Sequence, residues 1–408
     1  MKILWLCNIE IPIISENRHT AINSSGGWLD WISKQIINNK EYHLTVCYPK
    51  NELIDGRQEN FKYYSFIEST GTDKFFENII RKEKPDIIHI WGTEFAHSYD
   101  MVKAAAKFGM KNKIIISIQG LVSVYTKHYC AFLPDKVCRS YSFKDKVKSR
   151  SIYKEQKSFE NRGINEIKAI RGVDYVIGRT DWDYACTKQM NSDVNYFFCN
   201  ETLRDSFYKQ EWNLNNCKRH SIFLSQSSYP IKGFHLALEA FITVLQQYPD
   251  AHLYTTGSDI FTIPFWRLTS YQKHLSKIII ENDIKTKVSF LGNLSEQEMC
   301  DQYKKSHVFV SASSIENSPN SIGEAMLLGV PVISSDVGGV KNLMEHEKEG
   351  FIYQADAPYM LAFYINKIFS DDELVLKFSK NEKEHARFTH DRKVNLDNLI
   401  NIYTIVLN

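Results

Sequence analysis

Short apolar runs alternate with helical patterns along the first half of the chain. The runs are nearly continuous in apolar residues rather than alternating, and they lie at 3–7, 44–48, 87–91, 114–118 and 175–178. Continuous apolarity over this length is typical of strands that are covered on both faces, as in a parallel sheet. Helical patterns such as 27–38 and 101–108 lie between the runs. The first half therefore predicts an α/β domain with a mainly parallel sheet.

The same alternation restarts after a polar, poorly periodic stretch at 209–219. Further strand candidates lie at 221–225, 252–256, 288–291, 308–311 and 331–334. Two α/β halves predict two Rossmann-like, doubly wound domains, which we place at 1–208 and 209–384. Ligands of open α/β sheets bind beyond the C-terminal ends of the strands, so we expect a ligand-binding cleft between the two domains.

The composition narrows the class of protein. The chain has 408 residues, enough for two or three domains, and its 50 Lys and Arg nearly balance 48 Asp and Glu. A nucleic-acid partner is not expected, because such proteins carry a strong basic excess. The eight cysteines form no C-x-x-C pair and are interpreted as reduced core residues. Asn8 and Glu10 interrupt the first apolar run and no cleavage site follows, which favours a cytoplasmic protein without a membrane span.

The sharpest local motif lies at 313–326, where a loop of Ser, Asn and Pro enters a helical pattern. A helix entrance offers unpaired N–H groups and the positive end of a dipole, which suit phosphates or sugar hydroxyls. Glu316 precedes this entrance and Glu324 follows it, so the two carboxylates could contact different parts of one ligand. The alternative is a solvated loop carboxylate and an unrelated buried one.

This motif belongs to a longer pattern. It consists of a glutamate, seven residues and Glu-Ala-Met, with Pro-Asn inside the gap, and it continues through Gly-Val-Pro-Val-Ile-Ser-Ser-Asp-Val-Gly-Gly at 329–339. The pattern resembles the donor-site signature of glycosyltransferase family 4. The resemblance is tight over 223–353 and loosest over 122–168. It implies the GT-B fold, retaining transfer of a sugar from a nucleotide donor without a metal cofactor, and a C-terminal helix at about 385–408 that packs on the N-terminal domain.

Several roles follow from the resemblance for the second domain. Glu324 matches the glutamate that binds the ribose hydroxyls, and Glu316 matches the one that orients the transferred sugar. Lys232 matches the lysine that neutralises the leaving diphosphate, although a surface lysine capping a turn is the alternative. Further donor contacts are expected at Ser318, Asn320, Ser321 and Ile322, and around the base at Gly257, Gly292, Asn293 and Leu294.

The sequence departs from the family pattern at Gln226, where relatives usually carry a diphosphate-binding arginine. A glutamine can donate hydrogen bonds but brings no charge. Either other groups such as Arg179 or Arg204 compensate, or stabilisation of the leaving group is weaker.

In the first domain the resemblance points to the acceptor side of the cleft. Gly26 and Gly27 match a Gly-Gly loop facing the donor, with a plain helix-capping turn as the alternative. Gln119 stands where many relatives have a histidine. Glu94 and His97 are candidate acceptor contacts, or simple loop caps. Asp181 and Asp183 follow a Gly-Arg-Thr turn, which fits a helix N-cap better than a metal site.

A basic and aromatic segment occupies 127–157, with nine Lys or Arg against three acids. Such a segment could contact an anionic membrane or a lipid diphosphate acceptor. The alternative is a solvated, mobile loop, and RNA binding lacks a recognisable module.

The function predicted from the sequence is transfer of a hexose-type sugar to a glycan or lipid-linked acceptor, in surface polysaccharide biosynthesis. The competing hypotheses are a non-catalytic nucleotide-sugar or glycan-binding protein, and a phosphorylase or epimerase of the same fold.

Overall fold

The computed structural model describes residues 1–20, 24–68, 71–147 and 150–408. The chain forms two compact units. Unit 1 comprises residues 1–124, 160–205 and 390–408, and unit 2 comprises 125–159 and 206–389. Each unit contains its own parallel sheet with helices on both faces.

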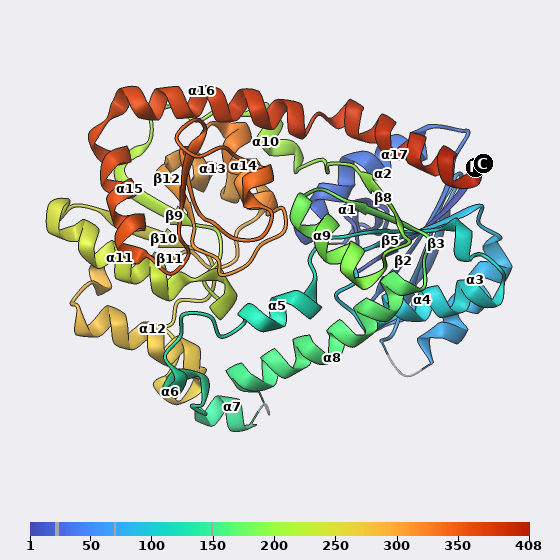
Figure 1. Ribbon diagram of the computed structural model, residues 1–408, viewed down its shortest axis with the longest axis horizontal. Helices are drawn as coiled ribbons and strands as arrows, with labels where there is room; N and C mark the ends of the chain where they lie inside the picture. The colour runs from blue at the N-terminus through green and yellow to red at the C-terminus, as the bar shows by residue number, and fades with distance from the viewer. Residues whose placement is uncertain (21–23, 69–70, 148–149) are drawn as a thin grey trace. The chain divides into compact units, whose positions relative to one another are not determined.

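Unit 1 is built on an eight-stranded sheet with the order β3-β4-β2-β1-β5-β6-β7-β8 (Figure 1). All neighbouring strands are parallel except the β3–β4 hairpin. The strands are β1 (Lys2–Cys7), β2 (His43–Pro49), β3 (Asp55–Gln58), β4 (Phe61–Phe66), β5 (Ile87–Trp91), β6 (Ile114–Ser117), β7 (Tyr175–Gly178) and β8 (Asn195–Phe198). The helices are α1 (Pro12–Asn17), η1 (Ser24–Leu29), α2 (Asp30–Asn38), α3 (Thr72–Glu83), α4 (Ala96–Lys107), η2 (Lys111–Lys113), α9 (Asp181–Met190) and α17 (Arg392–Leu407), with parts of α5 (Val122–His128) and α8 (Ile152–Arg171).

The continuous apolar strands of unit 1 supply two hydrophobic cores at once. Side chains alternate between the faces of a strand, so Leu4 and Leu6 join the core under α3 and α4, whereas Ile3 and Trp5 join the core under α2 and α17. Both sets are almost fully buried. Burial on both faces explains why these strands lack polar alternation.

Tyr403 anchors the C-terminal helix α17 to the sheet of unit 1. Its hydroxyl accepts a hydrogen bond from Trp5 Nε1 at 2.9 Å and lies 2.6 Å from Nδ1 of His89. His89 Nε2 lies 2.7 Å from Ser117 Oγ. All of these side chains are buried, and burial lowers the pKa of His89 to about 3. The C-terminal segment is therefore part of the first Rossmann-like unit.

Unit 2 contains a six-stranded, all-parallel sheet with the order β11-β10-β9-β12-β13-β14. Its strands are β9 (Lys218–Leu224), β10 (His252–Thr255), β11 (Val288–Phe290), β12 (Ser306–Ser311), β13 (Val332–Ser335) and β14 (Gly350–Tyr353). One layer of helices comprises α11 (Phe234–Gln247), α12 (Ser270–Glu281) and α15 (Pro358–Ser370). The other comprises α13 (Glu296–Lys305), α14 (Asn320–Leu328) and α16 (Asp372–Thr389). Short helices complete the unit: α6 (Asp135–Cys138), α7 (Phe143–Val147), α10 (Asp205–Lys209), η3 (Pro230–Lys232), η4 (Phe265–Arg267), η5 (Lys285–Lys287) and η6 (Val340–Asn342).

All ten predicted strands are confirmed, within three residues at each end. The apolar pattern missed β3, β4, β8 and β14. Of these, β3 and β8 carry mostly exposed or half-buried side chains, so they lack the apolar signal that marks the central strands.

Two segments differ from their predicted places. The prediction put 125–159 in the N-terminal domain, whereas its contacts group it with unit 2. The polar stretch at 209–219 lies within unit 2, where the backbone N–H of Trp212 donates to Leu328 O and its indole donates to Ser306 O, each at 2.8 Å. The predicted single C-terminal helix is two helices, α16 and α17, with a break at His390 and Asp391.

Among the described residues, none of the helices combines the length and apolarity needed to cross a bilayer.

Candidate functional site

Unit 2 contains a recess at the C-terminal ends of β9 and β12. Gln226, Lys232, Ser313, Glu316 and Ser321 are among its lining residues. Lys232 Nζ donates to Glu316 Oε1 at 2.5 Å, and Ser313 Oγ donates to the same oxygen at 2.7 Å. The Glu316 side chain is almost fully buried, whereas the Lys232 side chain is about one-third exposed. The recess thus brings together a cation, a carboxylate, a hydroxyl and an amide.

Gly233 places Lys232 beside the end of β12. It follows η3 and has φ of +65°, a backbone conformation that favours glycine. A Cβ atom at this position would lie 1.8 Å from Ala312 O, so no side chain fits there. The backbone N–H of Ser314 also donates to Ile231 O at 2.8 Å. A close backbone approach therefore sets the distance between Lys232 and the Glu316 loop.

The Glu316 loop is held from its other side by the turn after β13. Gly339 N donates to Glu316 O at 3.1 Å, and Ser335 Oγ donates to Ser313 O at 2.6 Å. Gly338 has φ of +51°, and a Cβ atom there would lie 1.8 Å from Glu316 O. Because the loop is fixed by close contacts on both sides, the Glu316 carboxylate is preorganised rather than free to move.

Helix α14 carries the other predicted donor residues of this motif. Asn320 begins the helix, Ser321 lines the recess, and Glu324 lies one turn further on with only 4% of its surface exposed. Ser318 precedes the helix and is buried, as is Ile322 inside it. Ser318, Asn320, Ile322 and Glu324 do not line the recess that contains Lys232 and Glu316. Their predicted contacts with a donor stay predictions.

The two glycine loops predicted to contact a base are joined to each other. Gly257 and Gly292 form an antiparallel bridge, with N–H···O distances of 2.9 and 3.1 Å. Both have positive φ, and a Cβ atom at Gly292 would meet no other atom within 4 Å. Asn293 is exposed and Leu294 is half-buried. The bridge gives one rigid backbone surface from two strand ends.

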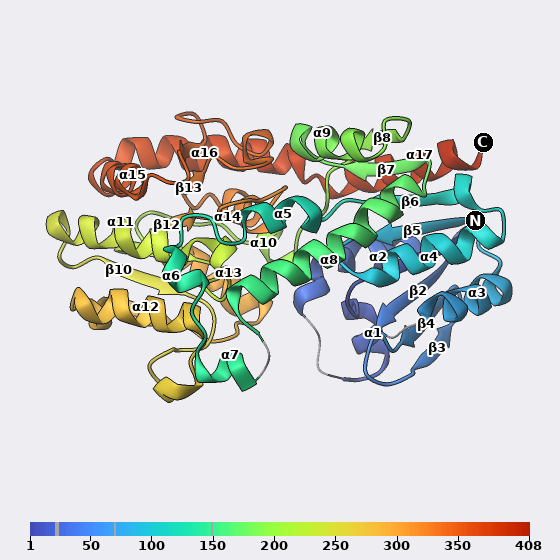
Figure 2. The ribbon, with the colours of Figure 1, turned by 60° about the horizontal axis from the view of Figure 1, so that its bottom comes forward.

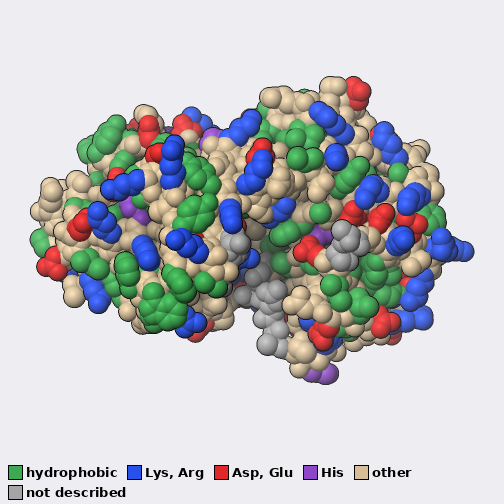
Figure 3. Space-filling view, turned by 90° about the horizontal axis from the view of Figure 1, so that it is seen from below, with side chains coloured by type: hydrophobic (Ala, Val, Ile, Leu, Met, Phe, Trp, Pro, Cys, Tyr) green, Lys and Arg blue, Asp and Glu red, His purple; other side chains and the backbone are tan. Residues whose placement is uncertain are grey.

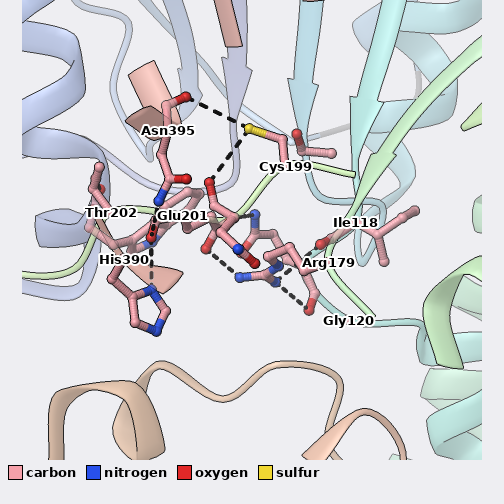
Figure 4. Close-up of polar contacts among 12 residues, drawn as sticks. Ile118, Gly120, Arg179, Cys199, Glu201, Thr202, His390 and Asn395 are labelled. Carbon is pink, nitrogen blue, oxygen red and sulfur yellow. Dashed lines mark hydrogen bonds and ion pairs between the residues drawn. The ribbon is translucent and has the colours of Figure 1, made fainter. Parts of the chain in front are cut away.

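In unit 1, Arg179 and Glu201 form a buried ion pair beyond the C-terminal ends of β7 and β8 (Figure 4). Arg179 Nη1 donates to Glu201 Oε2 at 2.5 Å, and Arg179 Nη2 donates to Ile118 O at 3.2 Å. Gln119 Nε2 donates to the other oxygen of Glu201. Burial raises the pKa of the Glu201 carboxyl, and the Arg179 guanidinium opposes this shift. Arg179 and Gln119 thus share one carboxylate.

This ion pair forms one wall of a pocket in unit 1. The rest of the lining is largely apolar and includes Trp28, Trp91 and Leu399. The backbone oxygen of Glu201 lies 2.9 Å from His390 Nδ1, which ties the start of α17 to this wall (Figure 4).

Glu94 and His97 lie in a second polar network of unit 1, linked through Asn8. Asn8 Nδ2 donates to Glu94 Oε2 at 2.7 Å, and Asn8 Oδ1 lies 2.8 Å from His97 Nε2. Gly120 N donates to Glu94 Oε1 at 3.2 Å, and His97 Nδ1 lies 2.7 Å from Glu68 Oε1. Desolvation raises the pKa of Glu94, whereas the hydrogen bond from His97 lowers the pKa of Glu68. The predicted acceptor residues Glu94 and His97 are therefore coupled.

The remaining predicted residues of unit 1 lie in helix starts. Gly26 and Gly27 are buried in η1, and a Cβ at Gly26 would lie 3.1 Å from Glu10 O. Asp183 forms a capping box with Thr180 at the start of α9, which confirms its interpretation as a helix cap.

Ser313, Asn8 and Glu201 were not predicted as site residues. Ser313 is three residues from Glu316, the spacing of a local side-chain contact, so its signal was present in the sequence. Asn8 and Glu201 follow strand ends, where polar side chains gather in α/β sheets. Glu201 was missed because the half-exposed strand β8 before it was not recognised.

The geometry defines an α/β protein with two Rossmann-like units, each with polar groups at the C-terminal ends of its strands. This is the GT-B fold, as comparison with solved structures shows. The sucrose-phosphate synthase (tll1590) from Thermosynechococcus elongatus is similar with a TM-score of 0.71 and 14% identity, over 100% of this chain and 99% of that one. Anabaena Alr3699/HepE in complex with UDP and glucose gives a TM-score of 0.69 and 15% identity, over 99% of both chains. The predicted fold class is confirmed.

Sequence comparisons locate the family signal in unit 2. Residues 205–385 match the family model described as Glycosyl transferases group 1. Spore coat protein SA from Bacillus subtilis is 27% identical over 188 residues, which cover 46% of this chain and 48% of that protein. The chain thus spans about half the length of the curated relatives it matches. The family match covers residues 205–385, and the solved neighbours, at 14% and 15% identity, share the fold of the chain.

Proposed function

We propose that the protein is a retaining glycosyltransferase of family 4 that transfers a hexose-type sugar from a nucleotide-sugar donor. The observation that carries this proposal is the contact between Lys232 and Glu316 in the recess of unit 2. A cation can bind the phosphates of a sugar diphosphate, and a carboxylate can accept hydrogen bonds from its sugar hydroxyls. Lys232 and Glu316 bring both groups to one edge of the sheet. The match of this unit to the group 1 family model supports the same assignment.

In this proposal Glu316 positions the transferred sugar. Among the described residues, the hydrogen bonds to its carboxylate from Lys232 and Ser313 both go to Oε1, so Oε2 can accept a sugar hydroxyl. A hydrogen bond to a charged group contributes about 1.5 to 3 kcal/mol. The fixed loop prevents the carboxylate from following the sugar as it moves, so the contact can favour the transition state over the bound donor.

Lys232 stabilises the leaving diphosphate in this proposal. Its side chain is partly exposed, so the ammonium group can reach a phosphate at the mouth of the recess. Negative charge develops on the leaving oxygen as the glycosidic bond breaks, and a cation fixed nearby lowers the barrier. Neutralisation by lysine is also the basis on which we propose transfer without a metal cofactor.

Glu324 is proposed to bind the ribose, and unit 1 the acceptor. HepE was solved with UDP and glucose, so a UDP-sugar is the first donor to test. We propose a glycan or lipid-linked acceptor, as in surface polysaccharide biosynthesis. The coupled groups around Asn8 in unit 1 offer both hydrogen-bond donors and acceptors to such hydroxyl-rich molecules.

Donor turnover tests the proposal directly. The full chain is incubated with UDP-, GDP- and ADP-sugars, and slow hydrolysis is followed by release of the nucleoside diphosphate. We expect one base to support turnover and Glu316→Gln to lower it about 10- to 150-fold. Release at the same rate from Glu316→Gln would remove the assignment of the recess as the catalytic site.

Gln226 favours a second candidate, a non-catalytic nucleotide-sugar or glycan-binding protein. This uncharged side chain lines the recess at the place of the family's arginine, so the diphosphate meets one cation fewer. Tight binding of a nucleotide sugar without turnover under any condition would establish the binding function. A phosphorylase or epimerase of the same fold would instead reveal itself by a phosphate requirement or by an isomerised sugar.

A further inference from the structure

Two segments far apart in sequence form one exposed aromatic surface on unit 2. Helix α7 contacts η4, and the rings of Phe143 and Trp266 meet edge to face with centroids 6.0 Å apart. Figure 2 shows α7 beside the gold loop that leads into α12. We define the aromatic patch as Tyr141, Phe143, Val147, Phe265 and Trp266.

The members of the aromatic patch are too exposed to be core residues. Phe143 is 59% exposed, Phe265 66% and Trp266 58%. Single exposed apolar side chains are normal on a protein surface, but several in contact mark an interaction site. Figure 3 shows hydrophobic and basic side chains interspersed on this face of unit 2.

Within the two segments that carry the aromatic patch, four of the five charged residues are basic. The ranges 141–147 and 264–274 contain Lys144, Lys146, Arg267 and Lys273 against one acid, Asp145. Lys273 Nζ lies 4.4 Å from the centroid of the Phe265 ring, and the Arg267 guanidinium lies 5.5 Å from the Trp266 ring. The cations are therefore mixed with the aromatic rings rather than separated from them.

Asp145 does not offset these cations at the surface, because it is buried and serves as an internal anchor. Its carboxylate accepts hydrogen bonds from the backbone N–H groups of Ser142 and Ser270, both at 2.9 Å, and from Ser270 Oγ. The same contacts cap the start of α12 and fix α7 against it. The aromatic patch is thus held on a rigid base, and its presentation to solvent is not the result of a loose loop.

We propose that the aromatic patch docks on an anionic lipid bilayer. Trp and Phe rings prefer the interface between headgroups and acyl chains, and Lys or Arg near an anionic surface contribute about 1 kcal/mol each. A protein partner could cover the apolar rings. An anionic bilayer interface matches both kinds of side chain, because it takes up the rings and its headgroups attract the positive charges. The patch lies away from the Lys232 recess in sequence and in its lining residues, so docking is separate from sugar transfer.

Vesicle flotation tests docking without any nucleotide sugar. The full chain is mixed with vesicles of phosphatidylcholine alone, or of phosphatidylcholine and phosphatidylglycerol in equal parts. We expect binding to the anionic vesicles only, weakened by salt because the Debye length shortens. Equal binding to both vesicles, or to neither, overturns the proposal.

Matched variants then assign the binding to this surface. Lys144→Gln with Lys146→Gln should weaken partitioning about 30-fold, equivalent to about 2 kcal/mol. Phe265→Ser with Trp266→Ser should weaken it on the order of tenfold or more, as both rings leave the interface. The controls are Phe388→Ser, which removes an 83% exposed ring from α16, and Lys377→Gln with Lys380→Gln on the same helix.

Two outcomes would overturn the assignment even if the wild-type protein binds vesicles. One is a loss of binding as large in the control variants as in the patch variants. The other is a patch variant that turns a dimer into a monomer in light scattering, because a second copy of the chain would then be the occupant. Donor hydrolysis, measured in parallel without vesicles, should be unchanged in the patch variants, so failure of docking is distinguishable from failure of the proposed transferase activity.

Discussion

Lys232 and Glu316 are 84 residues apart in the chain, and their side chains meet at 2.5 Å. Neither residue is brought there by its own secondary structure. The lysine ends η3 and the glutamate lies in the loop between β12 and α14. The contact depends on the parallel pairing of β9 with β12 and on the backbone approach at Gly233. It is the geometric basis of the proposed donor site.

The Lys232–Glu316 pair should act as a unit. We expect Lys232→Met and Glu316→Gln each to lower donor turnover about 10- to 150-fold, the equivalent of one hydrogen bond to a charged group. Turnover of the double variant should fall by less than the product of the two single-variant factors, because each single change already breaks the shared contact. Steady-state kinetics on all four proteins measure this coupling. Lys348→Met and Glu345→Gln, an exposed pair at 2.8 Å, serve as the matched control and should leave turnover unchanged.

Glu324→Gln should weaken nucleotide binding without unfolding the protein. The change keeps the volume of the buried side chain but removes the charge that would hold two ribose hydroxyls. We expect the dissociation constant of the preferred nucleoside diphosphate to rise roughly tenfold or more in calorimetry. The 2′-deoxynucleotide supplies the control, since its affinity should fall less on mutation. Identical affinities for wild type and variant would remove Glu324 from the ribose site.

Gly233→Ala should disrupt the recess, whereas Gly109→Ala should not. Both glycines have φ near +65°, so an alanine at either position costs about 1 to 2 kcal/mol in backbone conformation. Only at Gly233 would the new Cβ collide with a backbone oxygen, that of Ala312; at Gly109 it meets nothing within 4 Å. We therefore expect a larger drop in melting temperature for Gly233→Ala, together with loss of nucleotide binding. Equal melting temperatures for the two variants would contradict this account.

Gln226→Arg should raise donor turnover. The side chain lines the same recess as Lys232, and a second cation there would add to the stabilisation of the leaving diphosphate. We expect kcat to rise several-fold with little change in protein stability, because Gln226 is only half-buried. Gln226→Met, which adds no charge, is the control. No gain from the arginine would mean that leaving-group departure does not limit the rate.

His89 should make unit 1 sensitive to acid. Burial lowers its pKa from an ordinary value near 6.5 to about 3, so between these pH values the unfolded chain binds a proton that the folded chain does not. Stability is therefore full above about pH 6.5 and is lost as the pH falls toward 3, by about 1.4 kcal/mol per pH unit from this group.

Urea unfolding at several pH values measures this dependence. In His89→Gln the slope should be shallower by that amount in the same window. His43→Gln, which changes an exposed histidine, is the control. Since the buried His235 and His307, whose pKa values are also lowered, remain in both proteins, the difference between wild type and variant isolates His89. Parallel pH profiles for the wild type and His89→Gln would refute the prediction.

Local pattern was sufficient for the central strands and for the motif at the entrance of α14. Strands such as β5 are buried on both faces, and a run of apolar residues indicates this burial regardless of which elements cover the strand. The side chains of the edge strands β3 and β8 are exposed or half-buried, so these strands are not buried on both faces and were not predicted. The short spacing from Ser313 to Glu316 was also visible in the sequence, because such contacts form within one loop.

The sequence by itself thus determined most of the strands and which residue types could bind a sugar nucleotide. Only the tertiary structure decided which of them meet. The backbone approach of Gly233 to Ala312, the anchoring of 125–159 to α12 through Asp145, and the shared carboxylate of Glu201 all join segments distant in the chain. Apolar periodicity encodes which face of an element is buried, but it carries no information about which other element covers that face.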